Sequence, residues 1–316
     1  MQTWITVLLF LVGLVCIVKG GDWFLNGAVW IAEITGVPRF LIGATVVSLA
    51  TTLPELTVSV TGVLAGQIDL AVGNAVGSVT ANLGLILGLS ALCLPAMVTR
   101  RQFDCKAVLM VASAWMLLLL CRGNVLPMQH GLLLFAAFAV YLWNNLADAK
   151  SSRAPETNRP GVSRRQAGRK MLSFAVGIAA ILAGSHLLID CGSALALQLG
   201  VPAAIIGVTM VAVGTSLPEL VTALTAIAHR ETALSVGNIV GANIIDLTLI
   251  LPICAAVSGG ELTIGIQTTA LDLPACLLVC GVAVVPPLWK GRFYRWQGAA
   301  LLAIYAGYLM LLFQRA

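Results

Sequence analysis

Two copies of one 48-residue segment lie 164 residues apart in the chain, and each carries a glutamate inside a long apolar stretch. Residues 41–88 align with residues 205–252 without a gap, and 20 of the 48 positions are identical. Glu55 aligns with Glu219, and each directly follows a proline. An acidic side chain is costly in the hydrocarbon core of a membrane, so it is a functional candidate by default. A repeated acid beside a helix-breaking proline predicts an ion site at the interface between the repeats.

The composition predicts a protein that lies almost entirely within a membrane. Hydrophobic residues make up 59% of the chain and charged residues 10%, whereas a soluble domain is about 25% charged. The net charge of +5 does not indicate nucleic acid, because the basic residues lie between apolar segments. A helix needs about 20 residues to cross a bilayer. We therefore expect an all-α membrane protein with ten transmembrane helices, near residues 4–35, 40–65, 70–98, 106–121, 129–147, 171–199, 204–228, 233–258, 266–288 and 294–313.

A polar stretch at residues 148–170 divides these segments into two groups of five. Because five is odd, the second group must enter the membrane from the opposite side, so we predict inverted repeats. The expected domains are residues 1–147 and 171–316, each a five-helix repeat, with 148–170 as the linker. In this arrangement 15 lysines and arginines lie on the linker's side and two on the other. The positive-inside rule then places the linker in the cytoplasm and both termini outside.

The two prolines predict a helix break beside each glutamate. Proline cannot donate to the carbonyl four residues earlier, which frees carbonyls around Ala50–Thr51 and around Gly214–Thr215. Freed carbonyls are tolerated at membrane depth where they line a polar cavity. Hydroxyl groups lie in the same two turns, and they are candidate ligands as well: Thr51, Thr52, Thr215 and Ser216.

Each repeat adds candidate ligands in its following apolar segment. Ser78 and Asn82 share one helical face, and Ala242 and Asp246 occupy the matching positions in the second repeat. With the glutamates, the set holds three carboxylates, one amide, hydroxyls and freed carbonyls. Such all-oxygen sites suit hard cations; Ca²⁺ takes about six to eight oxygens, and the same oxygens can be divided among several Na⁺ ions. Ions that share ligands and cannot bind together provide a direct route to exchange.

Other residues that are the same in both repeats have structural interpretations. Asn74 and Asn238 are repeat-related, and we expect them to support the site or bridge helices. Glycines in the same segments are expected to let helices approach closely: Gly73, Gly77, Gly237 and Gly241. The eight cysteines form no CxxC pair and are interpreted as apolar packing residues. The remaining polar residues in or near spans are interpreted as interface pairs, snorkelling groups or vestibule residues: Lys19, Asp22, Glu33, His186, Asp190 and Asp272.

The motifs TTLPEL at 51–56 and GTSLPEL at 214–220, each followed by GN-x-V-G, resemble the two alpha repeats of the calcium/cation antiporter superfamily. In particular they look like those of bacterial and archaeal sodium/calcium exchangers. The resemblance implies a secondary antiporter, not an enzyme, that exchanges Ca²⁺ for Na⁺ in the inner (plasma) membrane. It implies no cofactor and no obligate protein partner. The expected binding partners are Ca²⁺ and Na⁺, as transported substrates, and membrane lipid.

Matching the motifs residue by residue gives the expected site. Glu55 and Glu219 take the central cation-binding positions of the superfamily. The flanking positions fall on Thr51, Thr215, Ser216, Ser78, Asn82 and Asp246. Thr52 stands where serine is common, and repeat one reads GSV where the superfamily usually has GSN.

Several alternative functions remain open from the sequence. Ca²⁺/H⁺ exchange would use protonated glutamates, although proton-coupled relatives more typically show GNATEL in place of TTLPEL. Potassium co-transport is possible because Asp246 adds a third carboxylate. An intramembrane hydrolase is disfavoured because no YD/GxGD-like pair is present, and a channel because broken helices in inverted repeats are typical of alternating access. The chain has no GxxxxGK[ST] loop, which argues against ATP-driven transport.

Overall fold

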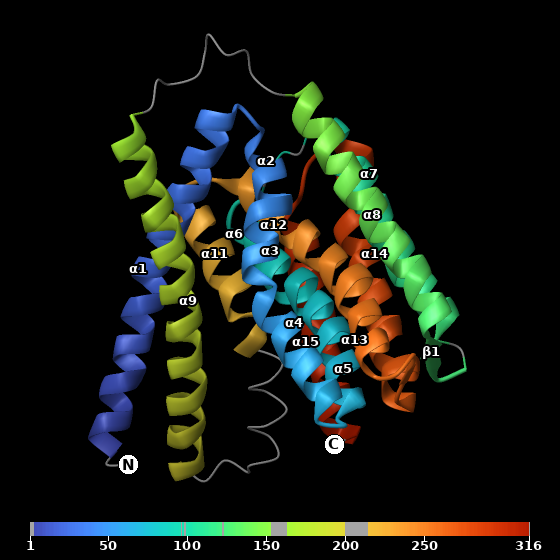
Figure 1. The fold of residues 1–316 in the computed structure, drawn as a ribbon. Helices are drawn as coiled ribbons and strands as arrows, with labels where there is room; N and C mark the ends of the chain where they lie inside the picture. The colour runs from blue at the N-terminus through green and yellow to red at the C-terminus, as the bar shows by residue number, and fades with distance from the viewer. Residues whose placement is uncertain are drawn as a thin grey trace.

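The chain folds almost entirely into helices (Figure 1). The computed structural model describes residues 3–315 except 96, 98, 122, 153–162 and 200–213. In the first half the helical elements, with π-helical turns marked η, are α1 (Thr3–Thr35), α2 (Arg39–Ile42), η1 (Gly43–Val47), α3 (Ser48–Thr51), α4 (Leu53–Leu64), α5 (Ile68–Ala81), η2 (Asn82–Leu87), α6 (Gly88–Cys93), α7 (Arg100–Leu120) and α8 (Met128–Ser151). In the second half they are α9 (Arg164–Gln198), α11 (Leu217–Ala228), α12 (Thr232–Ile245), η4 (Asp246–Ile250), α13 (Leu251–Val257), η5 (Thr268–Asp272), α14 (Leu273–Lys290) and α15 (Arg295–Arg315).

The prediction of a membrane protein is confirmed by the length and composition of these helices. In the described part of the chain, the pair Arg39–Thr51 and Leu53–Leu64 is bent by 40° and makes an eighth span if it is counted as one. The predicted segment 204–228 falls partly outside the described residues, and its described helix α11 has 12 residues. The predicted segment 294–313 coincides with α15, which has 21 residues. The seven helices that are each long and apolar enough to cross a bilayer are Thr3–Thr35, Ala71–Cys93, Arg100–Leu120, Met128–Ser151, Arg164–Leu195, Thr232–Val257 and Thr268–Lys290.

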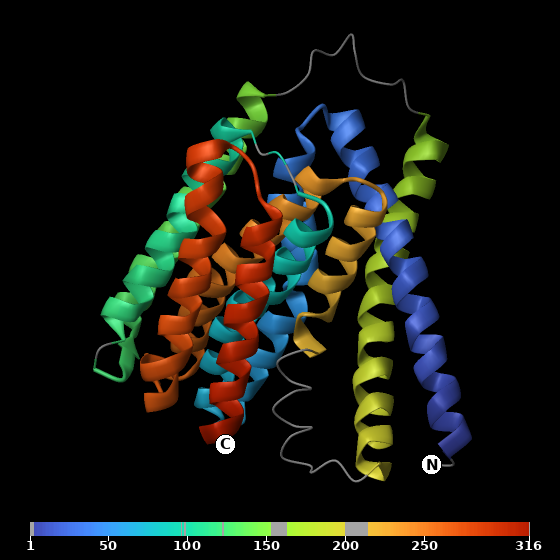
Figure 2. The ribbon, with the colours of Figure 1, turned by 180° about the vertical axis from the view of Figure 1, so that it is seen from behind.

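Helices reach further into the predicted linker than its polar composition indicated. α8 continues to Ser151 and α9 begins at Arg164, so the stretch between the two helices is shorter than residues 148–170. Charged side chains do not end a helix once it leaves the hydrocarbon core, because water and headgroups solvate them. The C-terminal end of α8 and the N-terminal end of α9 lie at one end of the molecule. The first turn of α1 and the last turn of α15 lie at the opposite end (Figures 1 and 2).

α1 and α9 pack along each other at the side of the bundle (Figures 1 and 2). Gly20 of α1 lies against Gly177 of α9: a Cβ atom added to Gly20 would come within 3.0 Å of the Gly177 carbonyl oxygen. Phe24 and Phe174 stack between the same helices with ring centroids 4.8 Å apart. Small residues at such crossings let the backbones approach and increase van der Waals contact.

α12 forms the centre of the bundle, and every residue from 234 to 245 is buried. Gly237 and Gly241 press against the backbone of α2 and η1, so the predicted close approach is confirmed at these two positions. At Gly73 and Gly77 no described atom lies within 4 Å of an added Cβ. The close contact between α12 and η1 joins an element of the second repeat to one of the first.

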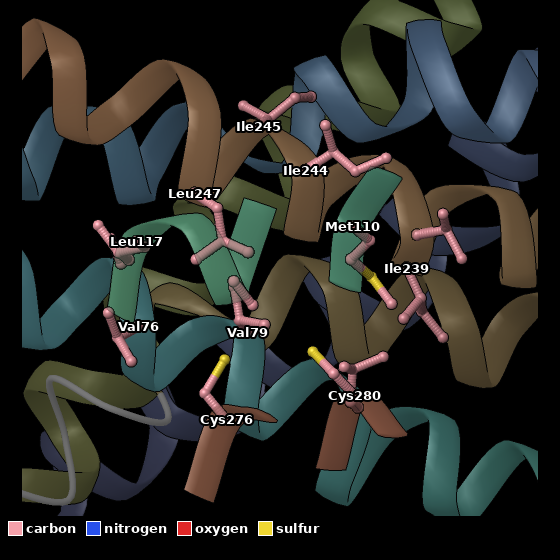
Figure 3. Close-up of a cluster of buried hydrophobic side chains, with 14 of the residues drawn as sticks. Val76, Val79, Met110, Leu117, Ile239, Ile244, Ile245, Leu247, Cys276 and Cys280 are labelled. Atoms are coloured by element: carbon pink, nitrogen blue, oxygen red, sulfur yellow. The ribbon is translucent and has the colours of Figure 1, made fainter. Parts of the chain in front are cut away.

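The apolar core surrounds α12 and is drawn from both halves of the chain (Figure 3). The side chains labelled in the figure come from α5, α7, α12, η4 and α14 and are almost fully buried. Four of the cysteines belong to this core, in agreement with their interpretation as packing residues: Cys121, Cys254, Cys276 and Cys280. The labelled residues are Val76, Val79, Met110, Leu117, Ile239, Ile244, Ile245, Leu247, Cys276 and Cys280.

Two features of the fold were not predicted. η2 begins at Asn82 and η4 begins at Asp246, the two positions that the repeat aligns. Single π-helical turns inside α-helices are frequent at functional sites. In addition, the expectation of an all-α chain misses a short antiparallel pair, β1 (Val125–Pro127) with β2 (Glu261–Thr263). Three-residue strands carry too few residues to show an alternating pattern in the sequence.

Candidate cation site

Each predicted glutamate lies in the first turn of a helix that begins at a break. α4 follows Thr52, whose φ and ψ are −82° and −1°, and α11 follows Ser216, with −84° and 5°. Both helices have their proline in the first turn, where a missing N–H loses no intrahelical bond. The predicted break beside each glutamate is confirmed, and it places Glu55 and Glu219 at a positive helix end, which favours a carboxylate.

The nine predicted ligands all lie in the interior. Their exposed fractions run from 0% for Glu219 and Asp246 to 7% for Thr215. Carboxyl groups are almost never buried to this extent unless they are paired or coordinate a metal. The nine are Thr51, Thr52, Glu55, Ser78, Asn82, Thr215, Ser216, Glu219 and Asp246.

Many oxygens of this set have no hydrogen-bond partner. In a folded protein the large majority of buried polar atoms are bonded. No lysine or arginine within the described ranges forms an ion pair with any of the three carboxylates. Buried carboxyl groups without a basic partner are neutralised either by a proton or by a bound cation. The unpaired oxygens are both carboxylate oxygens of Glu55, Glu219 and Asp246, the hydroxyls of Ser78 and Ser216, and Oδ1 of Asn82.

Two repeat-related hydrogen bonds join the halves of the site. Thr51 Oγ1 donates to Asn238 Oδ1 at 3.3 Å, and Thr215 Oγ1 donates to Asn74 Oδ1 at 3.1 Å. The repeat aligns these threonines with each other and these asparagines with each other. The bridging role predicted for the asparagines is therefore confirmed. Each asparagine also donates to a hydroxyl of its own repeat, at 3.0 Å in both cases: Ser59 Oγ and Thr222 Oγ1.

Each glutamate lies beside at least one hydroxyl group of the other repeat. Glu219 lies beside Thr51 and Thr52, and Glu55 lies beside Ser216 and within electrostatic range of the other two carboxylates. Across the described residues, however, no three Asp, Glu, His or Cys side chains are close enough to hold a metal ion by themselves. A cation bound here would need the neutral oxygens as well as the carboxylates.

Asp246, the third carboxylate, and Asn82, which the repeat aligns with it, have different hydrogen-bond surroundings. Asn82 donates from Nδ2 to Asn243 Oδ1 at 3.1 Å. The repeat aligns Asn243 with Val79, which offers no polar atom, and both oxygens of Asp246 are without a partner. The repeated motif therefore produces one tethered amide and one untethered carboxylate.

One residue near the site was missed by the sequence analysis. Tyr141 of α8 is fully buried and donates its hydroxyl hydrogen to the carbonyl of Ala44 in η1. Asn145 donates from Nδ2 to the Tyr141 carbonyl at 3.1 Å. A single tyrosine in an apolar segment carries no sequence signal that distinguishes this contact from ordinary packing.

Several of the remaining polar residues form pairs away from the site, as their interpretation predicted. Asp22 contacts His229 at 3.1 Å. Glu33 lies 3.6 Å from Arg39, which also bonds Glu231 at 2.8 Å. The hydroxyl of Tyr308 donates to Asp272 at 3.1 Å.

The fold and this site define an integral membrane protein with a buried, oxygen-lined polar centre where two broken helices meet. The sequence profile of the sodium/calcium exchanger protein family matches residues 5–147 and 170–314. This chain belongs to that family.

Similar proteins are known from bacteria and archaea. The inner membrane protein YrbG of Escherichia coli is 33% identical over 267 residues, covering 80% of each chain. The sodium/calcium exchanger MaX1 of Methanosarcina acetivorans is 28% identical over 350 residues, covering 98% of this chain and 99% of its own. The solved structure of the sodium-calcium exchanger NCX_Mj, soaked with Na⁺ and Sr²⁺, superposes with a TM-score of 0.86 at 26% identity, covering 98% of this chain and 99% of that one.

Proposed function

We propose that this protein is a secondary antiporter that exchanges Ca²⁺ for Na⁺ across the membrane by alternating access. The observation that carries the proposal is the set of buried oxygens without partners, six of which belong to carboxylates. Such a set matches the preference of Ca²⁺ and Na⁺ for oxygen ligands. Transport needs no cofactor and makes or breaks no covalent bond, so the protein is not an enzyme.

The proposed ligands divide by charge. Glu55 and Glu219 are the central ligands shared by the two kinds of ion, and Asp246 supplies the third carboxylate. The neutral oxygens complete the coordination and belong to Thr51, Thr52, Ser78, Asn82, Thr215 and Ser216. Because Ca²⁺ and Na⁺ compete for the same two glutamates, binding of one displaces the other, and this competition couples their movements.

Within this proposal the chain has ten transmembrane helices in two inverted repeats, residues 1–147 and 171–316. The family profile matches two stretches separated by most of the linker, and the exchanged threonine–asparagine bonds are what two repeats facing each other would make. The linker at 148–170 is cytoplasmic and both termini are outside, in a bacterial or archaeal inner membrane. The basic Arg101 at the start of α7 bonds Ser151 at the end of α8 at 3.0 Å, which supports one common basic face.

The transport proposal is tested with purified protein in liposomes. Uptake of ⁴⁵Ca²⁺ is measured with an outward gradient of Na⁺, of K⁺, or of H⁺, at clamped membrane potential. We expect uptake with the Na⁺ gradient and none with the H⁺ gradient alone. Uptake that follows the H⁺ gradient without Na⁺ would replace the proposal by Ca²⁺/H⁺ exchange, and a strict requirement for K⁺ together with Na⁺ would assign the third carboxylate to potassium.

The topology is tested by labelling one engineered cysteine. Ser152→Cys, in a background lacking the native cysteines, is expected to resist membrane-impermeant thiol reagents added outside right-side-out vesicles. The same cysteine should react after permeabilisation, which is the control for its accessibility. Labelling from outside the intact vesicles would contradict the orientation.

A further inference from the structure

The π-helical turn η1 leaves one carbonyl of the first broken helix without its usual helical bond. In an α-helix the N–H of Ser48 would bond the carbonyl of Ala44, four residues earlier. In η1 this N–H bonds the carbonyls of Gly43 and Thr45, the two residues on either side of Ala44. Ala44 is fully buried, and a buried carbonyl without a donor costs free energy. The π-helical turn therefore needs a donor from outside its own helix.

Tyr141 provides that donor from α8. Its hydroxyl donates to the Ala44 carbonyl, and its ring packs against Phe138 with ring centroids 6.3 Å apart. Gly241 of α12 leaves room for this bond, because a Cβ atom added to Gly241 would lie 2.8 Å from the Ala44 oxygen and 2.8 Å from the Tyr141 hydroxyl. Two helical elements of the first repeat and the central helix of the second thus meet at one carbonyl.

The π-helical turn also sets how the following part of the helix is rotated. Successive residues of an α-helix lie about 100° apart around its axis. A π-helical bond spans five residues where an α-helical bond spans four, so η1 holds one extra residue. If η1 changed into an ordinary α-helical turn, α3 would rotate by about 100° relative to α2.

Thr51 and Thr52 lie in the part of the helix that this rotation would move. The backbone N–H and the hydroxyl of Thr52 both donate to the Ser48 carbonyl, at 2.9 and 2.7 Å, so Thr52 is fixed to the first residue of α3. The Thr51 hydroxyl reaches Asn238 at 3.3 Å. Both threonines lie beside Glu219. A rotation of α3 would carry both hydroxyls away from that carboxylate.

We propose that Tyr141 is a positioning residue of the cation site. By holding the Ala44 carbonyl it keeps η1 π-helical, and in this way it fixes the rotation at which Thr51 and Thr52 face Glu219. The consequence for transport rests on the proposed Ca²⁺/Na⁺ exchange. Because Tyr141 acts through the two threonines and not as a ligand, its loss weakens ion binding in protein that is still folded.

The first test compares two substitutions that each remove one buried phenol hydroxyl. Tyr141→Phe should raise the half-saturating Ca²⁺ concentration of Ca²⁺/Ca²⁺ exchange in liposomes by about three- to tenfold. Tyr308→Phe, which loses the bond to Asp272 in another part of the bundle, is the matched control and should stay within about twofold of the wild type. A Tyr141→Phe protein that loses only thermal stability or maximal rate, with unchanged half-saturation, would overturn the proposal.

A double-mutant cycle tests whether Tyr141 acts through the threonines. In a protein that carries Thr51→Val and Thr52→Val, the hydroxyls that Tyr141 positions are already gone. Adding Tyr141→Phe to it should then change the half-saturating Ca²⁺ concentration by less than about twofold. The full three- to tenfold increase in this background would show that Tyr141 affects binding by another route.

The rotation itself is measured with a spin label, which needs no transport by the threonine variants. Leu49 lies in α3 and is 41% exposed. A nitroxide on Leu49→Cys, in a background lacking the native cysteines, reports contact with lipid through collisions with dissolved oxygen. Tyr141→Phe should lower the collision rate, because a rotated α3 turns position 49 away from its exposed side, and Tyr308→Phe should leave the rate unchanged.

The outcomes separate this proposal from the proposed function. Absence of Na⁺-driven Ca²⁺ flux in the wild type would contradict the exchange and leave the spin-label comparison as the test of Tyr141. Equal collision rates with and without the Tyr141 hydroxyl would show that η1 keeps its form without this bond, and the positioning role would be wrong.

Discussion

The two repeats build the same helix break but unequal surroundings. Glu55 and Glu219 both follow a proline, lie in a first turn and are buried to 1% or less exposure. Their following segments diverge: the first repeat supplies a hydroxyl and a tethered amide, and the second supplies a methyl group and an untethered carboxylate. The proline, the glutamate and the threonine four residues before it are thus the same in both repeats, whereas the following helix differs at 78/242 and 82/246.

Substituting the two glutamates, which are the same in both repeats, should give the largest effect. Glu55→Gln and Glu219→Gln should each lower Na⁺-driven Ca²⁺ uptake by about a hundredfold or more, because each removes a charge from a central ligand of a buried ion. Uptake of ⁴⁵Ca²⁺ into liposomes measures the effect. Glu33→Gln, at an exposed ion pair, is the matched control and should transport normally. Normal exchange by either site variant would refute the assignment.

A substitution that disturbs the packing of the central helix α12 should give the next largest effect, on the stability of the protein. Gly237→Ala should destabilise the protein by about 2 kcal/mol or more, because the added methyl group meets the backbone of α2. The difference in stability is measured by heating the protein and determining the remaining monodisperse fraction by size-exclusion chromatography. Gly281→Ala in α14 is the control, because no described atom lies within 4 Å of a Cβ added there. Equal stability of the two variants would show that α12 is not held tightly against the first repeat.

The difference between Asp246 in the second repeat and Asn82 in the first is tested by substituting Asp246. Asp246→Asn makes the second repeat like the first at this position, so Ca²⁺ transport should fall by less than about threefold. Asp246→Ala should be clearly worse, because it also removes the polar oxygens from a buried position. Initial rates of ⁴⁵Ca²⁺ uptake distinguish the two variants. Complete loss of transport by a folded Asp246→Asn protein would show that the third carboxylate is a required Ca²⁺ ligand.

The last prediction concerns the exchanged hydrogen bonds. Thr51→Val and Thr215→Val each remove one bond to an asparagine and one candidate hydroxyl ligand. Each should raise the half-saturating Ca²⁺ concentration by about three- to tenfold, and the two increases should agree within about threefold. A large effect in one variant alone would mean that the two ends of the site contribute unequally to Ca²⁺ binding.

Much of the fold could be predicted because membrane-spanning helices leave a strong local signal. The apolar segments, the breaks at the prolines and the burial of the glutamates were predicted from residues near one another in the chain. The boundaries near residues 148–170 were less accurate, because a helix can continue into water after its apolar part ends. The π-helical turns at Asn82 and Asp246 were not predicted, since an i to i+5 bond leaves no distinct pattern in composition.

By itself, the sequence determined that this chain enters a membrane, that it repeats a proline-broken helix, and that each copy brings a carboxylate with it. These properties follow from local chemistry and from the alignment of the chain with itself. Only the tertiary structure decided which polar groups have partners. Asn82 donates a hydrogen bond to Asn243, whereas neither carboxylate oxygen of Asp246 has a hydrogen-bond partner. It also decided that Thr51 and Thr215 bond across the repeats. Hydrogen bonds between residues more than 100 positions apart depend on how helices cross, and no local pattern encodes that crossing.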